Sequence, residues 1–388
     1  MQRAFRSPFE SATIIETVLV SVILAGLLFV TGAPSSNRSR AAGSVSVAGS
    51  MAAPRAGHTA TTLPDGQVLM AGGMERNGVF LASCELYEPA SGRFSPAAGM
   101  LTRRVSHTAT LLPNGQLLIG GGLEGRYREH GQWKGRAVAS AELYDHSTGT
   151  FTPAGPMTTS RSSHAAVLLP DGKVLIAGGS DGERNLASAE LFDPVTGRFT
   201  ATGPMSTARI PHVMVLLKDG KVLVAGGTGP DGRVLASAEV YDPLSRRFTP
   251  VGSMSTARHK HAAAVLPDGR VLILGGSDER DWRGQKNTAE LCDPTTARFH
   301  MAGRMNAARF KFHSTVLVLK NGKVLIAGGA ERVEVYDPAT GSFLLADGGL
   351  AKARYFAAAA LLPNGSVVIT GGYGNTDEAT TAAWIYRP

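Results

Sequence analysis

Cysteine is nearly absent from this sequence, and aromatic and charged residues are also scarce. Two cysteines in 388 residues exclude a disulfide scaffold and any multi-cysteine zinc or iron–sulfur cluster. The hydrophobic fraction of 43% is normal and the glycines follow no three-residue period, which excludes disorder and collagen. Aromatic residues make up only 6% of the chain, whereas glycine occurs 47 times. Many glycines with few aromatics indicate many tight turns and favour an all-β repeat protein.

The signatures of several common enzymes are missing as well. The sequence contains no phosphate-binding loop, no nucleophile elbow and no zinc-protease motif. No pair of carboxylates stands apart from the repeats described below, and the aspartates at Pro-Asp-Gly positions are explained by turns. We therefore assign no catalytic residue, no metal site and no cofactor from the sequence.

The N-terminus has the pattern of a secretion signal. Arg3 and Arg6 precede an uncharged apolar run at residues 18–30, which small residues follow. This run is shorter than the roughly 20 residues that a membrane span needs. We expect residues 1–33 to be a signal peptide and residues 34–43 a linker, which predicts a secreted or periplasmic protein. An uncleaved signal anchor is the alternative, and contact with a membrane is expected only in that case.

The chain carries a surplus of positive charge. Lysine and arginine number 39 against 31 acidic residues, which gives a formal net charge of +8. In a cytosolic protein this balance would suggest a nucleic-acid partner. The export signal argues against that setting, so we expect no nucleic acid; anionic polymers remain candidate partners, whose binding would weaken with salt.

A repeat organises the chain beyond its leader. Seven Gly-Gly pairs lie 43 to 57 residues apart, and each pair closes an apolar run that follows a Pro-Asp-Gly, Pro-Asn-Gly or related turn. Such turns between β-rich runs predict hairpins, because glycine supplies the positive φ that they need. A variable loop, a third run, another turn and a short fourth run follow each pair. Four short strands in about 50 residues are typical of a propeller blade. The pairs are Gly72-Gly73, Gly121-Gly122, Gly178-Gly179, Gly226-Gly227, Gly275-Gly276, Gly328-Gly329 and Gly371-Gly372.

The repeat resembles the kelch family, with its double glycine and an aromatic on the third and fourth strands. The third-strand residues are Tyr87, Tyr144, Phe192, Tyr241, Cys292, Tyr336 and Tyr386. The fourth-strand residues are Phe94, Phe151, Phe199, Phe248, Phe299 and Phe343. The resemblance covers residues 44–388 and implies an all-β fold, a seven-bladed kelch β-propeller with four antiparallel strands per blade. It says little about function, because propellers host many unrelated activities.

The two ends of the repeat region are expected to meet in one blade. The last copy ends on its third strand, at Tyr386, and lacks a fourth. Residues 44–51 align with the fourth-strand segment at residues 248–254. We therefore predict that the N-terminal strand closes the last blade and that deletion of residues 34–50 destabilises the whole ring.

An arginine recurs where each copy begins, and a histidine follows it three residues later in five of the seven copies. A ring of these residues near the propeller axis suggests a metal or anion site, but groups repeated in nearly every blade usually serve the fold. One glutamate per copy, in six copies, offers each arginine a partner, so we predict structural ion pairs. Copy seven has Trp384 in the glutamate position, so Arg354 is expected to be free or stacked on that indole. The arginines are Arg55, Arg104, Arg161, Arg209, Arg258, Arg309 and Arg354; the histidines are His58, His107, His164, His212 and His261; the glutamates are Glu85, Glu142, Glu190, Glu239, Glu290 and Glu334.

The run at residues 309–314 resembles a segment of the galactose oxidase family, whose catalytic domain is also a seven-bladed kelch propeller. That resemblance would imply a copper site built from a Tyr-His pair, a second histidine and a tyrosine crosslinked to cysteine. The nearest match here has Phe312 before His313, so the redox tyrosine is replaced. Cys84 and Cys292 lie at third-strand positions that are expected to pack within blades. A sugar-isomerising activity, known among periplasmic kelch propellers, is the other enzymatic alternative.

We therefore predict an exported, non-catalytic binding module for a glycan, a cell-envelope component or a protein, with an oxidoreductase or sugar isomerase as the alternative. The variable loops after the Gly-Gly pairs are the expected binding region, on the face opposite the uniform first turns. Replacing Trp133 and Trp282 with alanine should abolish binding and leave melting nearly unchanged. The candidate ligand-binding residues are Arg126, Tyr127, Arg128, His130, Trp133, Lys134, Trp282, Arg283 and Arg354.

Overall fold

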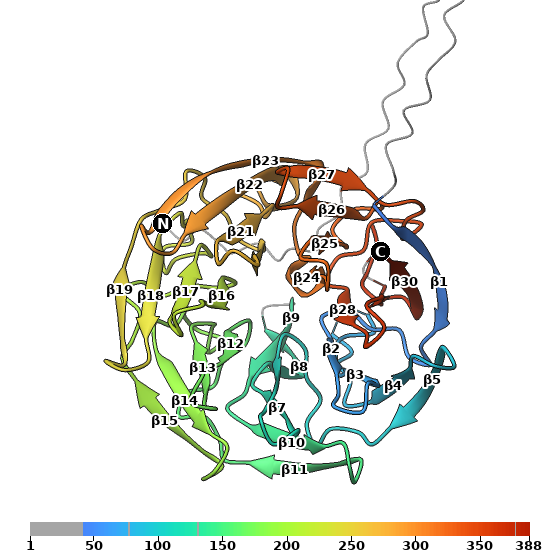
Figure 1. Cartoon of the computed structure of the whole chain (residues 1–388). Helices are drawn as coiled ribbons and strands as arrows, with labels where there is room; N and C mark the ends of the chain where they lie inside the picture. The colour runs from blue at the N-terminus through green and yellow to red at the C-terminus, as the bar shows by residue number, and fades with distance from the viewer. Residues whose placement is uncertain (1–41, 77, 130–131, 377) are drawn as a thin grey trace, which may run out of the picture.

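Seven four-stranded antiparallel sheets stand around a common axis in the computed structural model (Figure 1). The structure describes residues 42–388 except residues 77, 130–131 and 377. The expected signal peptide, and the expected linker up to residue 41, lie outside the described residues. The ring of sheets is a seven-bladed β-propeller, as the repeat predicts.

Each of the first three blades is an antiparallel meander whose first strand is nearest the axis (Figure 1). Blade 1 contains β2 (Thr59–Thr62), β3 (Val68–Ala71), β4 (Cys84–Glu88) and β5 (Arg93–Ala97). Blade 2 contains β6 (Thr108–Leu111), β7 (Leu117–Gly120), β10 (Ala141–Asp145) and β11 (Thr150–Ala154). Blade 3 contains β12 (Ala165–Leu168), β13 (Val174–Ala177), β14 (Ala189–Asp193) and β15 (Arg198–Thr202).

The remaining blades repeat this order, and the last blade takes its outer strand from the N-terminal end. Blade 4 contains β16 (Val213–Leu216), β17 (Val222–Ala225), β18 (Ala238–Asp242) and β19 (Arg247–Pro250). Blade 5 contains β20 (Ala262–Val265), β21 (Val271–Leu274), β22 (Lys286–Asp293) and β23 (Arg298–Arg309). Blade 6 contains β24 (Val316–Val318), β25 (Val324–Ile326), β26 (Glu334–Asp337) and β27 (Ser342–Leu345). Blade 7 contains β28 (Ala358–Leu361), β29 (Val367–Thr370), β30 (Ala382–Arg387) and β1 (Ser44–Ser50).

The closure of blade 7 confirms the predicted joining of the two ends. β1 pairs antiparallel with β30, from Ser44 opposite Arg387 to Ser50 opposite Ala382. The two strands lie side by side in Figure 1, β1 in blue and β30 in dark red. The phenol of Tyr386 also donates a hydrogen bond of 2.8 Å to the carbonyl of Ala42. This pairing leaves the ring without a gap between its first and last repeats.

The second strand of each blade is buried on both faces, which explains its continuous apolar sequence. In β13, all four residues from Val174 to Ala177 are fully buried. A strand that neighbouring sheets cover on both sides has no solvent-facing position and therefore does not alternate. The turn before this strand is closed by Asp171, whose carboxylate accepts a 3.1 Å hydrogen bond from the Lys173 amide. Gly172 in this turn has φ +83°, the conformation for which glycine is favoured.

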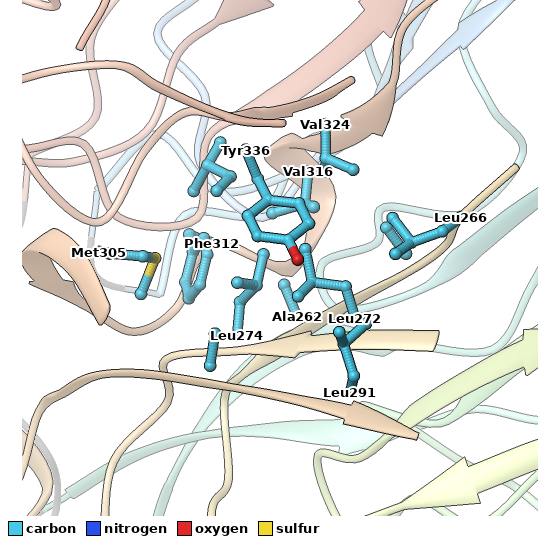
Figure 2. Packing of buried hydrophobic residues seen from close by; sticks show 13 residues of the cluster. Ala262, Leu266, Leu272, Leu274, Leu291, Met305, Phe312, Val316, Val324 and Tyr336 are labelled. Atoms are coloured by element: carbon cyan, nitrogen blue, oxygen red, sulfur yellow. The ribbon is translucent and has the colours of Figure 1, made fainter. Parts of the chain in front are cut away.

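The core is divided into clusters that fill the spaces between neighbouring blades. Figure 2 shows the cluster between blades 5 and 6, where Leu272 and Leu274 of β21 meet Val324 of β25 and Tyr336 of β26. The predicted third- and fourth-strand aromatics also form pairs, for example Tyr87 and Phe94 with ring centroids 4.9 Å apart. Contact between adjacent sheets therefore holds the blades together.

Helical structure in the described residues is limited to two 3₁₀ turns, η1 (Asp281–Arg283) and η2 (His313–Thr315). No helix in this part of the chain is long and apolar enough to cross a membrane. η1 lies in the loop between the second and third strands of blade 5, on the face that we call the loop face. The loop face carries the connections after the Gly-Gly pairs together with the blade-to-blade connections, which bridge each other at pairs such as Ala56 with Met74.

Candidate functional site

Six buried ion pairs form the frame beneath the loop face. In blade 5, Arg258 donates a hydrogen bond of 2.7 Å to Glu290, and both side chains are fully buried. The same guanidinium donates to the carbonyls of Gly275 and Thr288. The Glu290 carboxylate also accepts the amide of Ser255, at 2.7 Å. Each pair therefore ties the incoming connection to the second and third strands of its own blade, which confirms the predicted structural role. The equivalent pairs are Arg55–Glu85, Arg104–Glu142, Arg161–Glu190, Arg209–Glu239 and Arg309–Glu334.

We expect Glu290→Gln to lower the free energy of unfolding by about 3–5 kcal/mol, because it leaves the guanidinium of Arg258 buried without its counter-charge. Urea denaturation measures this change directly. Asp231→Asn is the matched control, since the Asp231–Arg233 pair is exposed and contributes little. A Glu290→Gln variant with the denaturation midpoint of the control would contradict the assigned role.

Blade 7 departs from this frame as the sequence predicts. Arg354 has no carboxylate partner among the described residues, and its guanidinium lies 5.4 Å from the ring centroid of Trp384. Trp384 is itself 3% exposed and part of the core of β30. Arg354 is partly buried, so this candidate ligand-binding residue lies under the loop face, stacked on an indole. Burial lowers its pKa.

The five histidines pack between blades. A β-carbon on Gly121 would lie 2.7 Å from Cε1 of His164, so the first glycine of one blade receives the imidazole of the next. Burial, followed by the charge of Arg161, lowers the pKa of His164 well below its usual value. In blade 6, Phe312 takes this position against Gly275. A phenyl ring in the same position shows that this contact does not require a titratable group. Burial likewise lowers the pKa values of His58, His107, His212 and His261.

Backbone hydrogen bonds link neighbouring blades around the propeller axis. The residue two positions after the repeated arginine has a positive φ in six of the seven blades. The exception is Pro211 in blade 4. The amides of these residues donate around the axis to the carbonyl of the equivalent residue in the preceding blade, as from Phe356 to Lys311 at 2.7 Å. Pro211 has no amide hydrogen and interrupts the ring. The donor-to-acceptor pairs are Ser163 to Ser106, Ser106 to Gly57, Gly57 to Phe356, Phe356 to Lys311 and Lys311 to Lys260.

One sector of the loop face, at blades 5 to 7, contains a cluster of aromatic side chains around a buried lysine. The ammonium of Lys311 lies 4.2 Å from the centroid of Trp282 and 4.9 Å from that of Phe310. Lys311 also donates a hydrogen bond of 3.0 Å to the hydroxyl of Tyr373. Trp282 meets Phe310 and Tyr355 edge-on, with centroids 4.7 and 4.8 Å apart. We call Trp282, Phe310, Lys311, Tyr355, Phe356 and Tyr373 the Trp282 cluster; Phe356 joins it through Lys311 and Tyr373.

The Trp282 cluster breaks the repeat, and a signal for it is present in the sequence. The residue directly after the repeated arginine is small or aliphatic in blades 1 to 4 but aromatic in blades 5 to 7. These residues are Ala56, Val105, Ser162, Ile210, His259, Phe310 and Tyr355. Sequence reasoning singled out Trp282 and missed its neighbours Phe310, Lys311, Tyr355 and Tyr373. Aligning this one position across the copies would have located Phe310 and Tyr355.

The candidates in copy two lie on a β-hairpin, where the sequence suggested only a long loop. β8 (Leu123–Glu129) pairs with β9 (Gln132–Ala137), with Tyr127 opposite Lys134 and Arg128 opposite Trp133. His130 lies outside the described residues. The structure therefore brings Arg126, Tyr127, Arg128, Trp133 and Lys134 into one hairpin of blade 2, separate from Trp282 and Arg283 in blade 5. A depression of about 240 Å³ lies next to the hairpin, lined by Gly78, Val79, Phe80, Arg103 and Gly125.

The donor set needed for a galactose-oxidase-like copper site does not fit these residues. Phe312 is packed in the core between blades, and His313 is exposed at the start of η2. Cys84 and Cys292 are buried in blades 1 and 5, and burial raises the pKa of each thiol to about 11. Within the described part of the chain, no three His, Cys, Asp or Glu side chains gather as metal ligands. The predicted packing of both cysteines within blades is confirmed.

The fold and the repeated frame define a seven-bladed β-propeller, and comparison with known proteins agrees. The Kelch motif matches residues 161–206 and 215–255, so blades 3 and 4 are kelch repeats. Among solved structures, a novel fungal alcohol oxidase of the AA5 family, in complex with copper, is similar with a TM-score of 0.68. The alignment covers 89% of this chain and 76% of that one at 19% identity, a level that shows a shared fold. A search of curated proteins found no match.

Proposed function

We propose that this propeller is an exported, non-catalytic binding module whose ligand is a glycan, an envelope component or a protein. The observation that carries the proposal is the Trp282 cluster, where the loop face departs from the repeat. A symmetric ring needs no such cluster for its own closure, since blades 1 to 4 close with small or aliphatic residues in the equivalent position. Trp282 is 38% exposed, so part of an aromatic ring of this cluster is accessible to a ligand.

Export is part of the same proposal. The N-terminal leader supports it, and the two buried free thiols in blades 1 and 5 are compatible with an oxidising compartment. Expression of the full chain with a C-terminal tag, followed by fractionation, tests export. Recovery of the protein in the cytosol at full length would contradict it.

The binding module is tested by screening the folded protein against a glycan array and against envelope fractions. We expect saturable binding to at least one class of ligand, with loss of affinity on substitution in the loop face at blades 5 to 7. Binding that is lost only on substitution in the turns between the first and second strands, on the opposite face, would contradict a binding site on the loop face. No binding in any format would contradict the module itself.

An oxidoreductase is the second candidate, because the alcohol oxidase with a similar fold binds copper. We expect the protein, incubated with Cu²⁺ and then desalted, to retain no stoichiometric copper. We also expect no hydrogen peroxide from primary alcohols or galactosides. Phe312 stands where the copper-binding pattern has a tyrosine, and both cysteines are buried inside blades, so these residues cannot supply that set of copper ligands. Stoichiometric copper with peroxide formation would favour the enzyme and overturn the binding module.

A further inference from the structure

The loop of blade 5 presents a tryptophan and an arginine side by side at the surface. Both Trp282 and Arg283 belong to η1, and both are exposed. η1 is the only helical turn in the Gly-Gly loops of the described residues. This short turn places an indole and a guanidinium next to each other on the loop face.

The orientation of Trp282 is fixed before any ligand arrives. Phe310 and Tyr355 meet the indole at interplanar angles of 82° and 81°, and both are buried. Lys311 covers one face of the ring from 4.2 Å. Only the remaining surface of the indole is accessible to a ligand, and these contacts hold it in one orientation. An aromatic surface held in this way loses little entropy on binding, which makes it suited to be a binding hot spot.

The carboxylates of this loop are already engaged. Asp278 pairs with Arg280 at 2.7 Å and with Lys286 at 3.3 Å. Asp281 holds Lys260 at 2.6 Å. The side chain of Glu279 accepts the amide of Val234 from the neighbouring blade.

Arg283 is the exception among the charged residues of this loop. It has no carboxylate partner among the residues that the structure describes, and its side chain is exposed. Asp281 adopts φ +52°, a conformation that non-glycine residues seldom adopt. That backbone is held by the Lys260 contact, which fixes where η1 points its next two side chains. The loop thus offers one exposed apolar ring and one unpaired cation, both on a constrained backbone.

We propose that Trp282 and Arg283 form the binding site for an acidic saccharide ring, an inference that rests on the proposed binding function. The indole stacks on the apolar face of the sugar, and the guanidinium pairs with its carboxylate or sulfate group. A guanidinium presents parallel donors to such groups, and its planar shape suits both of them. An anionic sugar would meet less repulsion at this loop because its carboxylates already have ion-pair or hydrogen-bond partners, at Asp278, Glu279 and Asp281.

The test measures affinity of the full chain for four acidic saccharides by calorimetry: oligogalacturonate, hyaluronate fragments, sialyllactose and a sulfated dextran oligomer. Methyl-esterified oligogalacturonate is the neutral counterpart of the first. We expect at least one acidic saccharide to bind, and we expect methyl-esterified oligogalacturonate to bind at least about tenfold more weakly than a binding oligogalacturonate. Carboxylated and sulfated ligands in separate arms distinguish which anionic group the guanidinium prefers. Affinity should also fall as salt is added, since the pair is exposed.

Two substitutions locate the site. Arg283→Gln removes the charge at an exposed position and should weaken binding about tenfold or more without changing melting. Trp282→Ala should abolish binding, but it also removes packing against Phe310 and Tyr355, so some loss of stability is expected. Arg233→Gln, on the exposed loop of blade 4, is the matched control and should bind like the unaltered protein.

The outcomes separate this inference from the proposed function. If none of the four acidic saccharides binds, or if Arg283→Gln binds them normally, the acidic-saccharide site is overturned. Binding of a neutral glycan or a protein in those cases would leave the binding module standing. Equal affinity for the methyl ester and the free acid would likewise overturn the role of Arg283.

Discussion

Lowering the pH from 7 to 4 is expected to unfold the propeller, with uptake of protons by the histidines that pack between blades. Burial lowers the pKa of His107 and of His212 to about 3, and it holds the pKa values of His58, His164 and His261 well below 6.5. In the unfolded chain each of these groups titrates near 6.5. The folded state therefore excludes protons that the unfolded state binds.

The sign of the effect follows from this difference. Above pH 6.5 both states are neutral at these positions and stability is complete. As the pH falls below 6.5, the unfolded state gains protons and stability decreases, until the pH reaches the folded pKa of each histidine, which is about 3 for His107 and His212. Each histidine contributes a slope of about 1.4 kcal/mol per pH unit, so five together give about 7 kcal/mol per pH unit. This exceeds the effect of any single substitution discussed above.

His261→Phe is the matched test, because blade 6 already has Phe312 in the same position. The variant should fold at pH 7, since the ring of Phe312, labelled in Figure 2, lies against Gly275 as the imidazole of His261 lies against Gly226. On unfolding, the variant should take up one proton fewer than the unaltered protein. The pH dependence of the urea midpoint measures this difference, because its slope depends on the number of protons taken up. The reverse change, Phe312→His, should add one proton. Unaltered pH dependence in both variants would show that other groups control acid unfolding.

The sequence predicted the ring because its repeat encodes interactions that every blade makes. The double glycines, the Arg–Glu pairs and the aromatic pair on the outer strands each recur in most copies. A buried arginine needs a carboxylate, so Arg258 and Glu290 could be matched without a structure. The same reasoning located Arg354 on Trp384, where the glutamate is missing.

The Trp282 cluster could not be predicted in the same way, because its members are far apart in the sequence. Trp282 lies in a loop of blade 5, Lys311 in the connection to blade 6 and Tyr373 in the loop of blade 7. Only the order of blades around the axis brings these connections together. The β8–β9 hairpin was also missed as secondary structure, since its polar and glycine-containing sequence has no apolar alternation.

Removing residues 34–50, which include all of β1, is expected to lower the free energy of unfolding by several kcal/mol and to broaden the transition. Six paired positions along β30 lose their partner strand. Each ladder hydrogen bond contributes about 1 kcal/mol, against a total stability of about 5–15 kcal/mol for a typical domain. The exposed edge of β30 would then be free to pair with other chains, so aggregation should accompany the loss. Urea denaturation and light scattering measure both effects.

Two single substitutions in β1 separate strand closure from other effects of the deletion. Val45 packs on the core cluster of blades 6 and 7, whereas Val47 is 75% exposed and belongs to no core cluster of the described residues. Val45→Asp should therefore reproduce much of the destabilisation, because it places a charge against Trp384 and its neighbours. Val47→Asp should melt like the unaltered protein, since it keeps the same backbone pairing. If both valines tolerate aspartate, or if the deletion melts normally, β1 does not hold the ring closed and the stability of the propeller resides in the contacts between its other blades.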